Sequence, residues 1–418
     1  MTFDVATLRK EFPTLQREVG GRRLVYLDSA ATSQTPEVVL AAMDRYYRHS
    51  RSNVHRGVYR LAEEATDAYE GARTALARLV GADERGVVFT KNATEACNLI
   101  AYGWVRRQLG PGDALLCTVM EHHANMVPFQ HAAKDRGFEM RYVPITPDGQ
   151  LDLDVAAELV ADGRVRFAAF THVSNTLGTI NDVPRIAALV RAANPEAIVH
   201  VDGTQAVPHL PVDLASLGAD SYALTGHKMF GPTGIGALVA DPALLERMEP
   251  FLTGGEMIRD VTLAGATWND IPHRFEAGTP PIAEAAGLTA AVAFLEELGT
   301  DRVRAHEMAL GESFLAALEA ADGVDVHGPR DMAQRGGAIS FTLEGVHPHD
   351  VGAVLDDRGV CVRVGHHCCK PLMREMGVNA TVRASLHVYN DEDDIEPLLE
   401  GLTAARRMFA APAGPGRA

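Results

Sequence analysis

Between about residues 26 and 240, short apolar segments alternate with amphipathic segments of helical periodicity. Several of these segments are apolar throughout, as expected for strands that are buried on both faces of a sheet. Strands that are separated by helices form crossover units and therefore run parallel. The pattern predicts an α/β fold with a mostly parallel sheet. Its apolar segments include Val87–Thr90, Ala114–Thr118, Val165–Thr171, Ile198–Val201, Ser221–Thr225 and Ile235–Ala240.

The pattern changes after a long helix rich in alanine and leucine, expected at residues 281–299. The segments that follow predict a smaller C-terminal α+β domain, with helices at 302–321, 350–357 and 392–409 and strands at 337–342 and 360–364. A short helix with Asp4 as its N-cap is expected near the start of the chain. We therefore predict a large domain at 24–295, a small domain formed by 1–23 and 296–409, and a disordered tail at 410–418.

Charge and cysteine content narrow the functional classes. The chain has 418 residues and a net charge of -16, which argues against a nucleic-acid partner and against an anionic membrane surface. No apolar stretch reaches the roughly 18 residues of a membrane span, and the N-terminus does not resemble a signal peptide. Five cysteines, an odd number that includes an adjacent pair, are typical of a reducing compartment. We therefore expect a cytoplasmic protein.

Two residues at predicted strand ends indicate a specific chemistry. Lys228 follows the apolar run Ser221–Thr225, and Asp202 ends the earlier run at 198–201. Pyridoxal 5'-phosphate (PLP) enzymes need such a pair, because the lysine amine forms a Schiff base and the carboxylate keeps the pyridine nitrogen protonated. Either residue alone is more often a surface lysine or a turn aspartate, but the pair favours a PLP site.

Three further polar residues follow predicted strands. Thr94 is the expected N-cap of a helix whose N-terminal N–H groups could hold a phosphate, although a plain capped helix has the same pattern. His122 could stack on a ring, move a proton or bind a metal, and Asn175 could bind a phenolic oxygen or a carboxylate. Ligands of open α/β sheets bind at the carboxyl ends of the strands, where all these residues are expected.

The segment Arg363-Val364-Gly365-His366-His367-Cys368-Cys369-Lys370 is the second distinctive feature. A thiol beside histidines, arginine and lysine is a good candidate nucleophile. A complete metal site is disfavoured, because ligands in immediate succession cannot all converge on one tetrahedral ion. A buried structural cysteine is the other alternative, against which the glycine and the polar histidines favour a turn.

Together these segments resemble the cysteine desulfurases of PLP fold type I, within the class V aminotransferase-like enzymes. The similarity is greatest to group II, which serves the sulfur-mobilising (SUF) iron–sulfur assembly system. It extends over about residues 5–409 and includes the following motifs, of which the last is the most specific: Tyr26-Leu27-Asp28-Ser29-Ala30-Ala31, Val54-His55-Arg56-Gly57, Glu121-His122-His123-Ala124-Asn125, Val201-Asp202-Gly203-Thr204-Gln205, Gly226-His227-Lys228, Arg274-Phe275-Glu276-Ala277-Gly278-Thr279-Pro280 and Arg363-Val364-Gly365-His366-His367-Cys368.

The resemblance implies a role for each matching residue. It implies a PLP-dependent transferase fold with a seven-stranded sheet, and an enzyme that converts L-cysteine to L-alanine while sulfur stays on an active-site cysteine as a persulfide. The implied catalytic residues are Cys368, Lys228 and His122, with His122 also stacked on the ring. The implied cofactor contacts are Lys228, Asp202, Gln205, Ala93, Thr94, Thr225, His227 and Asn175, with Thr279 donated by the second subunit of a homodimer. The implied substrate contacts are Arg383, Asn175, Ala30, His55 and Arg363.

The sequence departs from the family pattern at three positions. Ala93 stands where many relatives have threonine, Thr225 replaces a usual serine, and Cys369 follows the nucleophile where alanine is common. The role of Cys369 stays open at this point.

The implied partner is a sulfur-acceptor protein of the SUF system. No resident metal is expected, but His349 matches a histidine that takes over a zinc ligand position of a zinc-bearing U-type acceptor; an E-type acceptor is the alternative. Selenocysteine lyase is a second interpretation of the same motifs. A non-catalytic metal-binding scaffold of the assembly pathway, using His366, His367, Cys368 and Cys369, is an interpretation from another class.

Overall fold

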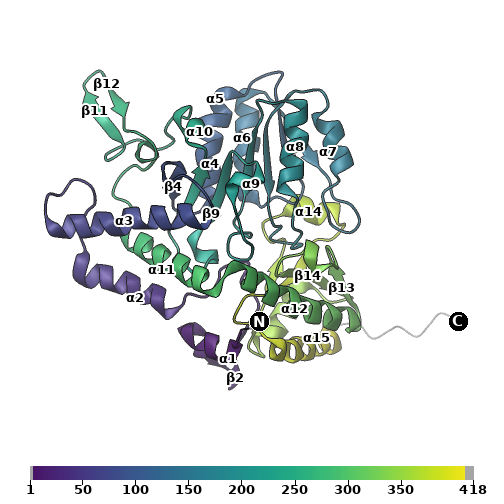
Figure 1. Ribbon diagram of the computed structural model, residues 1–418. Coiled ribbons are helices and arrows are strands. Elements are labelled where there is room, and N and C mark those ends of the chain that lie inside the picture. Colours follow the sequence, from purple (N-terminus) through teal and green to yellow (C-terminus); the bar gives the residue numbers. More distant parts are fainter. Residues whose placement is uncertain (1–2, 410–418) are drawn as a thin grey trace.

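The computed structural model describes residues 3–409 and contains two main sheets (Figure 1). The predicted disordered tail at 410–418 lies outside the described residues. The larger sheet has seven strands in the order β4-β10-β9-β8-β7-β5-β6. All neighbours pair in parallel except β10, which is antiparallel to both β4 and β9. The predicted α/β fold with a mostly parallel seven-stranded sheet is confirmed. Its strands are β4 (Val87–Thr90), β5 (Ala114–Thr118), β6 (Glu139–Val143), β7 (Val165–Thr171), β8 (Ile198–Asp202), β9 (Ser221–Thr225) and β10 (Gly236–Ala240).

Helices cover both faces of this sheet, which explains why its central strands are apolar throughout. Neighbouring residues of β5 alternate between two core clusters: Leu115 packs in one and Leu116 in the other. One cluster is covered by α4 (Ala93–Ile100), which continues through a π-helical turn (Ala101–Val105) and α5 (Arg106–Gln108), and by α6 (Val127–Arg136) and α10 (Pro242–Glu246). The other is covered by α2 (Glu37–Arg45), α3 (Arg60–Leu79), α7 (Leu153–Val160), α8 (Val183–Ala193) and α11 (Ile282–Leu298).

The smaller sheet is antiparallel, with the order β13-β14-β17-β16, and has its own apolar core. Figure 1 shows α12 and α15 beside it at the lower right. The strands are β13 (Val324–His327), β14 (Ala338–Leu343), β16 (Arg363–Gly365) and β17 (Thr381–Ser385). The helices are α12 (Thr300–Ala320), α13 (Pro348–Asp356), α14 (Lys370–Glu375) and α15 (Ile395–Phe409). The residue limits predicted for the two domains stay a prediction.

The N-terminal segment is held against this smaller part of the molecule. Helix α1 (Val5–Leu8) is capped by Asp4, as the sequence predicted. The short strand β3 (Val25–Tyr26) pairs in parallel with β15 (Val360–Cys361). The buried Arg9 guanidinium donates to the Tyr389 carbonyl oxygen at 3.0 Å and to the Leu24 carbonyl oxygen at 3.0 Å. Backbone carbonyls therefore satisfy a buried charge where the two ends of the chain meet.

Some elements differ from the sequence-based expectation. The single strand predicted at 360–364 is two short strands, because β15 pairs with β3 whereas β16 pairs with β17. A hairpin of β11 (Ile258–Thr262) and β12 (Gly265–Trp268) projects from the molecule, at the upper left of Figure 1, and was not predicted. Its side chains are mostly exposed, so it lacks the apolar pattern that identifies buried strands.

A buried charged cluster joins the two parts of the molecule. Glu307 of α12 accepts from His209 Nδ1 at 2.7 Å and lies 3.1 Å from His387 Nδ1. His209 follows β8, and His387 follows β17. The two histidines hold the pKa of the fully buried Glu307 carboxyl at about 2, although burial alone would raise it. The ionised carboxylate thus connects α12 with the segments that follow β8 and β17.

Candidate active site

A cavity of about 200 Å³ lies at the carboxyl ends of β7, β8 and β9, beside the N-terminus of α4. This is the position at which open α/β sheets bind ligands. The cavity brings together most of the cofactor residues that the sequence predicted. Its lining residues include Ala93, Thr94, His122, Asn175, Asp202, Gln205, Thr225, His227, Lys228 and Arg363.

Lys228 ends a single 3-10 turn, Gly226–Lys228, directly after β9. Its pKa is lowered to about 8, first by burial and then by the positive charge of Arg383, while Asp202 acts in the opposite direction. A substantial fraction of the Lys228 amine is therefore neutral near physiological pH. Such an amine can act as a nucleophile and can accept a proton.

The Asp202 carboxylate is held at the end of β8. The Thr204 N–H donates to Asp202 Oδ1 at 3.0 Å, and Asp202 is 5% exposed. Gly203 is required between these two residues, because a Cβ there would lie 1.7 Å from the ring of Tyr222. The close contact with Tyr222 therefore fixes the backbone that presents the carboxylate to the cavity.

His122 is a neutral imidazole with a defined tautomer. Burial, together with the charge of Lys228, lowers the pKa of His122 to about 4. The Ala124 N–H donates to His122 Nδ1 at 3.1 Å, so the ring proton of neutral His122 resides on Nε2. Beneath it, the buried Glu121 carboxyl has a pKa raised to about 8 by burial and accepts from Thr118 Oγ1 and Asn125 Nδ2.

The N-terminus of α4 and the end of β9 form a region suited to a phosphate. The N-cap of α4 is Asn92 rather than Thr94, because the Asn92 side chain accepts from the Glu95 N–H at 3.0 Å. Thr94 instead lies in the first turn, where helix N–H groups remain available to an anion. Within residues 3–409, the buried hydroxyls of Thr225 and Thr204 at this cavity find no hydrogen-bond partner. These unpaired donors fit a phosphate-bearing ligand.

A buried arginine lies next to the cavity. Arg383 of β17 is 1% exposed and donates to Asp28 Oδ1 at 2.9 Å and to the Asn175 carbonyl oxygen at 2.7 Å. Its Nε has no partner among the described residues. A carboxylate could accept from this guanidinium, as the sequence predicted for the substrate. Gln205 Nε2 donates to the Ala30 carbonyl oxygen at 2.7 Å, so Ala30, which does not itself line the cavity, contacts a residue that does.

Cys368 lies in the loop between β16 and α14, with its side chain partly exposed. Arg363, which lines the cavity, donates to Cys368 Sγ at 3.7 Å. His367 and Cys368 have φ values of 49° and 57°, a left-handed conformation that non-glycine residues rarely adopt. A residue of another segment fixes this loop: the backbone N–H of His123 donates to the Cys368 carbonyl oxygen at 2.8 Å.

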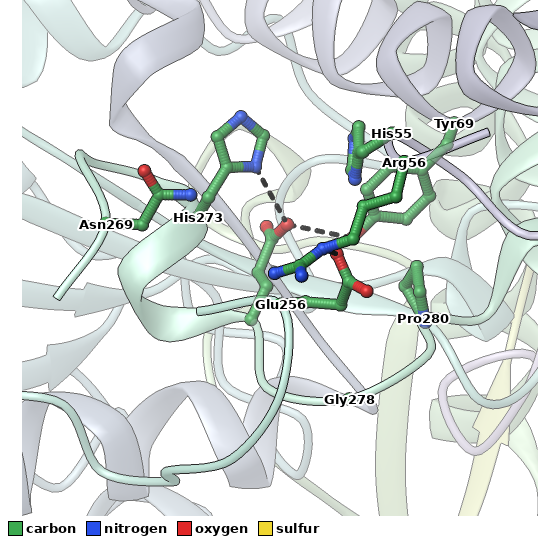
Figure 2. A pocket seen from close by; sticks show the side chains of 9 residues that line it. His55, Arg56, Tyr69, Glu256, Asn269, His273, Gly278 and Pro280 are labelled. Atoms are coloured by element: carbon green, nitrogen blue, oxygen red, sulfur yellow. Dashed lines mark hydrogen bonds and ion pairs between the residues drawn. The ribbon is translucent and has the colours of Figure 1, made fainter. Parts of the chain in front are cut away.

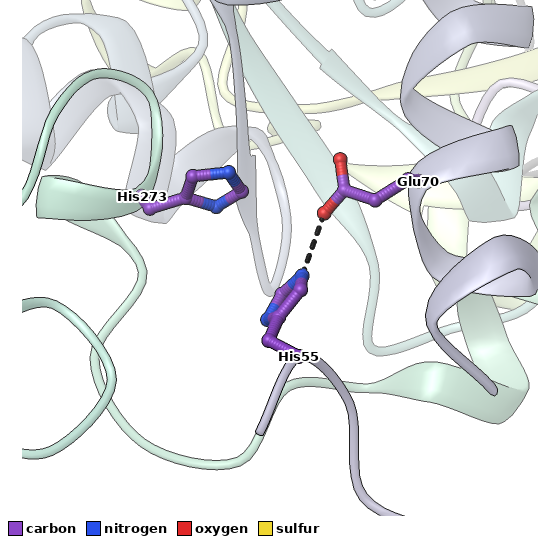
Figure 3. Close-up of side chains that lie close together, drawn as sticks. All are labelled: His55, Glu70 and His273. Carbon is purple, nitrogen blue, oxygen red and sulfur yellow. Dashed lines mark hydrogen bonds and ion pairs between the residues drawn. The ribbon is translucent and has the colours of Figure 1, made fainter. Parts of the chain in front are cut away.

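Two predicted site residues lie away from this cavity. His55 lines a second hollow with Arg56, Tyr69 and His273 (Figure 2). His55 Nε2 and Glu70 Oε1 are 2.9 Å apart, and His273 faces the same point (Figure 3). Thr279 is exposed in the neighbouring loop and does not line the cofactor cavity. Within one chain, therefore, His55 and Thr279 do not meet Lys228.

The predicted zinc-related histidine lies on the surface of the smaller part of the molecule. His349 is exposed in the first turn of α13, and the N-cap is His347, whose Nδ1 accepts from the His349 N–H at 3.2 Å. The helix starts earlier than residue 350, where the sequence predicted it, because Pro348 is well accommodated at the first helical position.

Sequence analysis missed several contributors to the site. Asp28, which pairs with Arg383, and Thr204, whose hydroxyl faces the cavity, lie within recognised motifs but were assigned no role. Glu121, within another motif, is fully buried and ties the end of β5 to β7 through the Thr171 N–H at 3.0 Å. No signal in the sequence distinguished Glu121, which stands at the end of an apolar segment and is followed by two polar histidines.

Comparison with known proteins agrees with this geometry. The family model described as Aminotransferase class-V matches residues 25–398. The chain belongs to the class-V aminotransferase family. A probable cysteine desulfurase of Halobacterium salinarum is 49% identical, with 97% of this chain and 98% of the relative covered.

Solved structures extend the comparison to three dimensions. A cysteine desulfurase from Thermococcus onnurineus superposes with a TM-score of 0.92 at 38% identity, covering 98% of this chain and 99% of the other. A cysteine desulfurase from Escherichia coli gives 0.88 at 35% identity, covering 98% and 100%. The family resemblance predicted for this class-V aminotransferase is thus confirmed, as is its PLP-dependent fold.

The scaffold interpretation is not supported by the positions of the ligand-type residues. Within residues 3–409, two groups of three such residues approach within 4.8 Å: His55–Glu70–His273 and His209–Glu307–His387. Neither group includes a residue of the segment His366–Cys369. In that segment the His367 ring forms a hydrogen bond with the Thr381 hydroxyl, whereas the Cys369 thiol contacts Asn175. In the part of the chain that the structure describes, no helix is long and apolar enough to cross a membrane.

Proposed function

We propose that this class-V aminotransferase is a cysteine desulfurase that converts L-cysteine to L-alanine and retains the sulfur as a persulfide on Cys368. The observation that carries the proposal is the convergence of Lys228, Asp202 and Arg363 on one cavity, together with the Cys368 sulfur 3.7 Å from the Arg363 guanidinium. A transaminase would need the first two residues but not a cysteine nucleophile. The relatives named above carry the same activity in their names.

The cofactor is PLP, and the cavity fits it through unpaired donors as well as through its lysine. Thr225, Thr94 and the first turn of α4 would hold the phosphate, with His227 beside them. Asp202 would face the pyridine nitrogen, His122 would stack on the ring, and Lys228 would hold the aldehyde carbon. When bound, PLP withdraws electrons from the substrate Cα, which makes its proton acidic.

The chain's own groups position L-cysteine and move protons. The Arg383 guanidinium and the Asn175 amide would bind the substrate carboxylate, with Arg363 nearby. The Lys228 amine, with its pKa of about 8, can take the proton from Cα. The Nε2–H of His122 would then donate a proton to the substrate, which completes the proton transfer.

The sulfur step needs the Cys368 thiolate. Its sulfur attacks the substrate Sγ, a new S–S bond forms, and the Cβ–S bond of the substrate breaks. The electron pair of that bond stays with the substrate carbon, which takes up a proton and becomes the methyl group of alanine. Cys368 is left as a persulfide, and no external oxidant is needed, because the reduced carbon balances the oxidised sulfur.

The assembly and the partner belong to the same proposal. A homodimer would bring Thr279, and with it the hollow around His55, to the cavity of the second subunit. The acceptor of the persulfide would be a SUF-system protein serving iron–sulfur assembly. A zinc-bearing U-type protein that meets His349 is favoured over an E-type protein. All five cysteines are free, as expected for work in the reducing cytoplasm.

The decisive experiment measures alanine and protein-bound persulfide from L-cysteine by the PLP-loaded protein, with L-selenocysteine as the competing substrate. Wild type should form one alanine for each sulfur delivered, and Lys228→Ala and Cys368→Ser should both be inactive. Lys228→Ala should also lose the covalent cofactor link that borohydride traps. Turnover of selenocysteine alone would make the protein a selenocysteine lyase. Full activity of Cys368→Ser would refute the assignment of the nucleophile.

A further inference from the structure

The second thiol of the Cys368–Cys369 pair lies in the protein interior. Cys369 is 0% exposed, and its Sγ is 3.2 Å from Asn175 Oδ1, 3.3 Å from the Glu121 carbonyl oxygen and 3.6 Å from the Met120 carbonyl oxygen. All three neighbours are hydrogen-bond acceptors only. A thiolate in this position would face these three acceptor oxygens, so the geometry favours a protonated thiol, although a hydrogen bond from the Thr176 side chain acts in the opposite direction.

The orientation of Asn175 gives the same result independently. The Asn175 side chain lies 2.7 Å from the His367 carbonyl oxygen, which can only accept, so the amide nitrogen must be on that side. The amide oxygen must then face Cys369, and at 3.2 Å it is the nearest of the three acceptors of the thiol. Burial raises the pKa of Cys369 to about 12, in agreement with this assignment.

These bonds connect Cys369 to the loop of the candidate nucleophile. The His367 carbonyl belongs to the peptide that leads into Cys368, and both residues have left-handed backbone conformations. Such conformations persist only where the surroundings hold them. The backbone carbonyl oxygen of Asn175 also accepts a hydrogen bond from the Arg383 guanidinium at 2.7 Å. One asparagine therefore links the loop, the arginine and the buried thiol.

We propose that Cys369 is a positioning residue whose S–H donates to Asn175 Oδ1 and thereby holds Asn175 against the His367 carbonyl and Cys368 in its left-handed conformation. Cys369 does not carry sulfur itself. The part of this inference that concerns sulfur transfer depends on the proposed desulfurase function. The part that concerns loop rigidity does not.

The test uses the full-length PLP-loaded protein and compares Cys369→Ala, which lacks the donor, with Cys369→Ser, whose hydroxyl keeps it. Cys117→Ala is the control, because Cys117 is equally buried and its thiol faces backbone oxygens only. The first measurement is amide hydrogen exchange of a peptide covering residues 363–372. We expect exchange about tenfold faster in Cys369→Ala and close to wild type in the other two variants.

The second measurement is the rate of persulfide formation on Cys368 in a single turnover with L-cysteine. It should fall about tenfold in Cys369→Ala and recover in Cys369→Ser. In an Asn175→Ala background, Cys369→Ala should change neither quantity further, because the bond is already lost. The inference would be overturned if amide exchange in Cys369→Ala were as slow as in wild type. It would also be overturned if exchange in Cys369→Ser were as fast as in Cys369→Ala. A wild-type protein that forms no alanine would refute the proposed function, whereas the exchange experiment would still decide the positioning role.

Discussion

Several single residues around the candidate site have their protonation set by burial. His200, at the centre of β8, is fully buried, and burial lowers its pKa to about 4. Its Nδ1 is 2.8 Å from Ser221 Oγ on the next strand. The native state therefore keeps this ring neutral in a pH range where an unfolded chain would protonate it.

This difference predicts a pH dependence of stability. Because the folded pKa lies below the ordinary 6.5, the contribution of His200 is complete above pH 6.5 and is lost as the pH falls toward 4. Between pH 7 and 5, His200 should account for about 2 kcal/mol of lost unfolding free energy. Urea unfolding of cofactor-free His200→Asn should show a correspondingly smaller acid loss than wild type. The same substitution at exposed His131 should leave the acid loss unchanged; equal losses in all three proteins would contradict the assignment.

His349 gives a second prediction at this scale. Its exposed ring at the start of α13 can exchange with a ligand of an incoming zinc protein. With a chemical reductant, His349→Ala should release sulfide at the wild-type rate, since the cavity is untouched. Stimulation by a zinc-bearing acceptor should be lost, whereas His347→Ala should keep it. Equal stimulation of His349→Ala and wild type would favour an E-type acceptor instead.

Among the elements, α4 combines structural and binding roles at its first turn. Asn92 caps this helix, and its neighbours line the cavity. Asn92→Ala should lower the unfolding free energy of the cofactor-free protein by about 1 kcal/mol. Asn92→Asp should restore that stability, because aspartate also caps helices. However, its negative charge should oppose the phosphate and weaken PLP binding severalfold in fluorescence titrations. If Asn92→Asp binds PLP as tightly as wild type, the phosphate does not lie at this turn.

The elements also show how far the sequence could predict the structure. Strands buried on both faces, such as β7 and β8, are recognisable by their largely apolar residues, and the ends of β8 and β9 located Asp202 and Lys228. The hairpin β11–β12 could not be found, because its side chains are mostly exposed and lack an apolar pattern. The division at Val362 could not be found, because the partner of β15 is β3, which lies far away along the chain. For the same reason, the burial of Arg383 and the contact between Cys369 and Asn175 became visible only in the structure.

For the whole molecule, the buried Glu307 cluster is a charged connection between the two parts. Glu307→Gln keeps the shape but removes the charge that the two histidines face. It should lower the unfolding free energy by about 3 kcal/mol, as measured by urea denaturation. Glu312→Gln, at an exposed position of the same helix, should change it by no more than about 0.5 kcal/mol. Similar losses of unfolding free energy in both variants would contradict a structural role of the cluster.

The proposed homodimer with shared active sites predicts complementation between two inactive proteins. Lys228→Ala lacks the amine, and Thr279→Trp should obstruct the cavity of the neighbouring subunit. In a mixed dimer, one cavity carries both defects and the other carries neither, so about half of the wild-type activity should return. Purified heterodimers carrying two different tags allow this measurement. Heterodimers without activity would mean that each cavity is complete within one chain.

The pairing of β3 with β15 also has a consequence for biosynthesis. Residues 25–26 leave the ribosome long before their partners at 360–361 are translated. The hydrogen bond from the Arg9 guanidinium to the Tyr389 carbonyl oxygen likewise cannot form until Tyr389 has been translated. The seven-stranded sheet can assemble while translation continues, since its strands end at residue 240. Residues 9–26 therefore reach their places only after a segment more than 300 residues further along the chain has been made, and this N-terminal arm closes onto a sheet that has already formed.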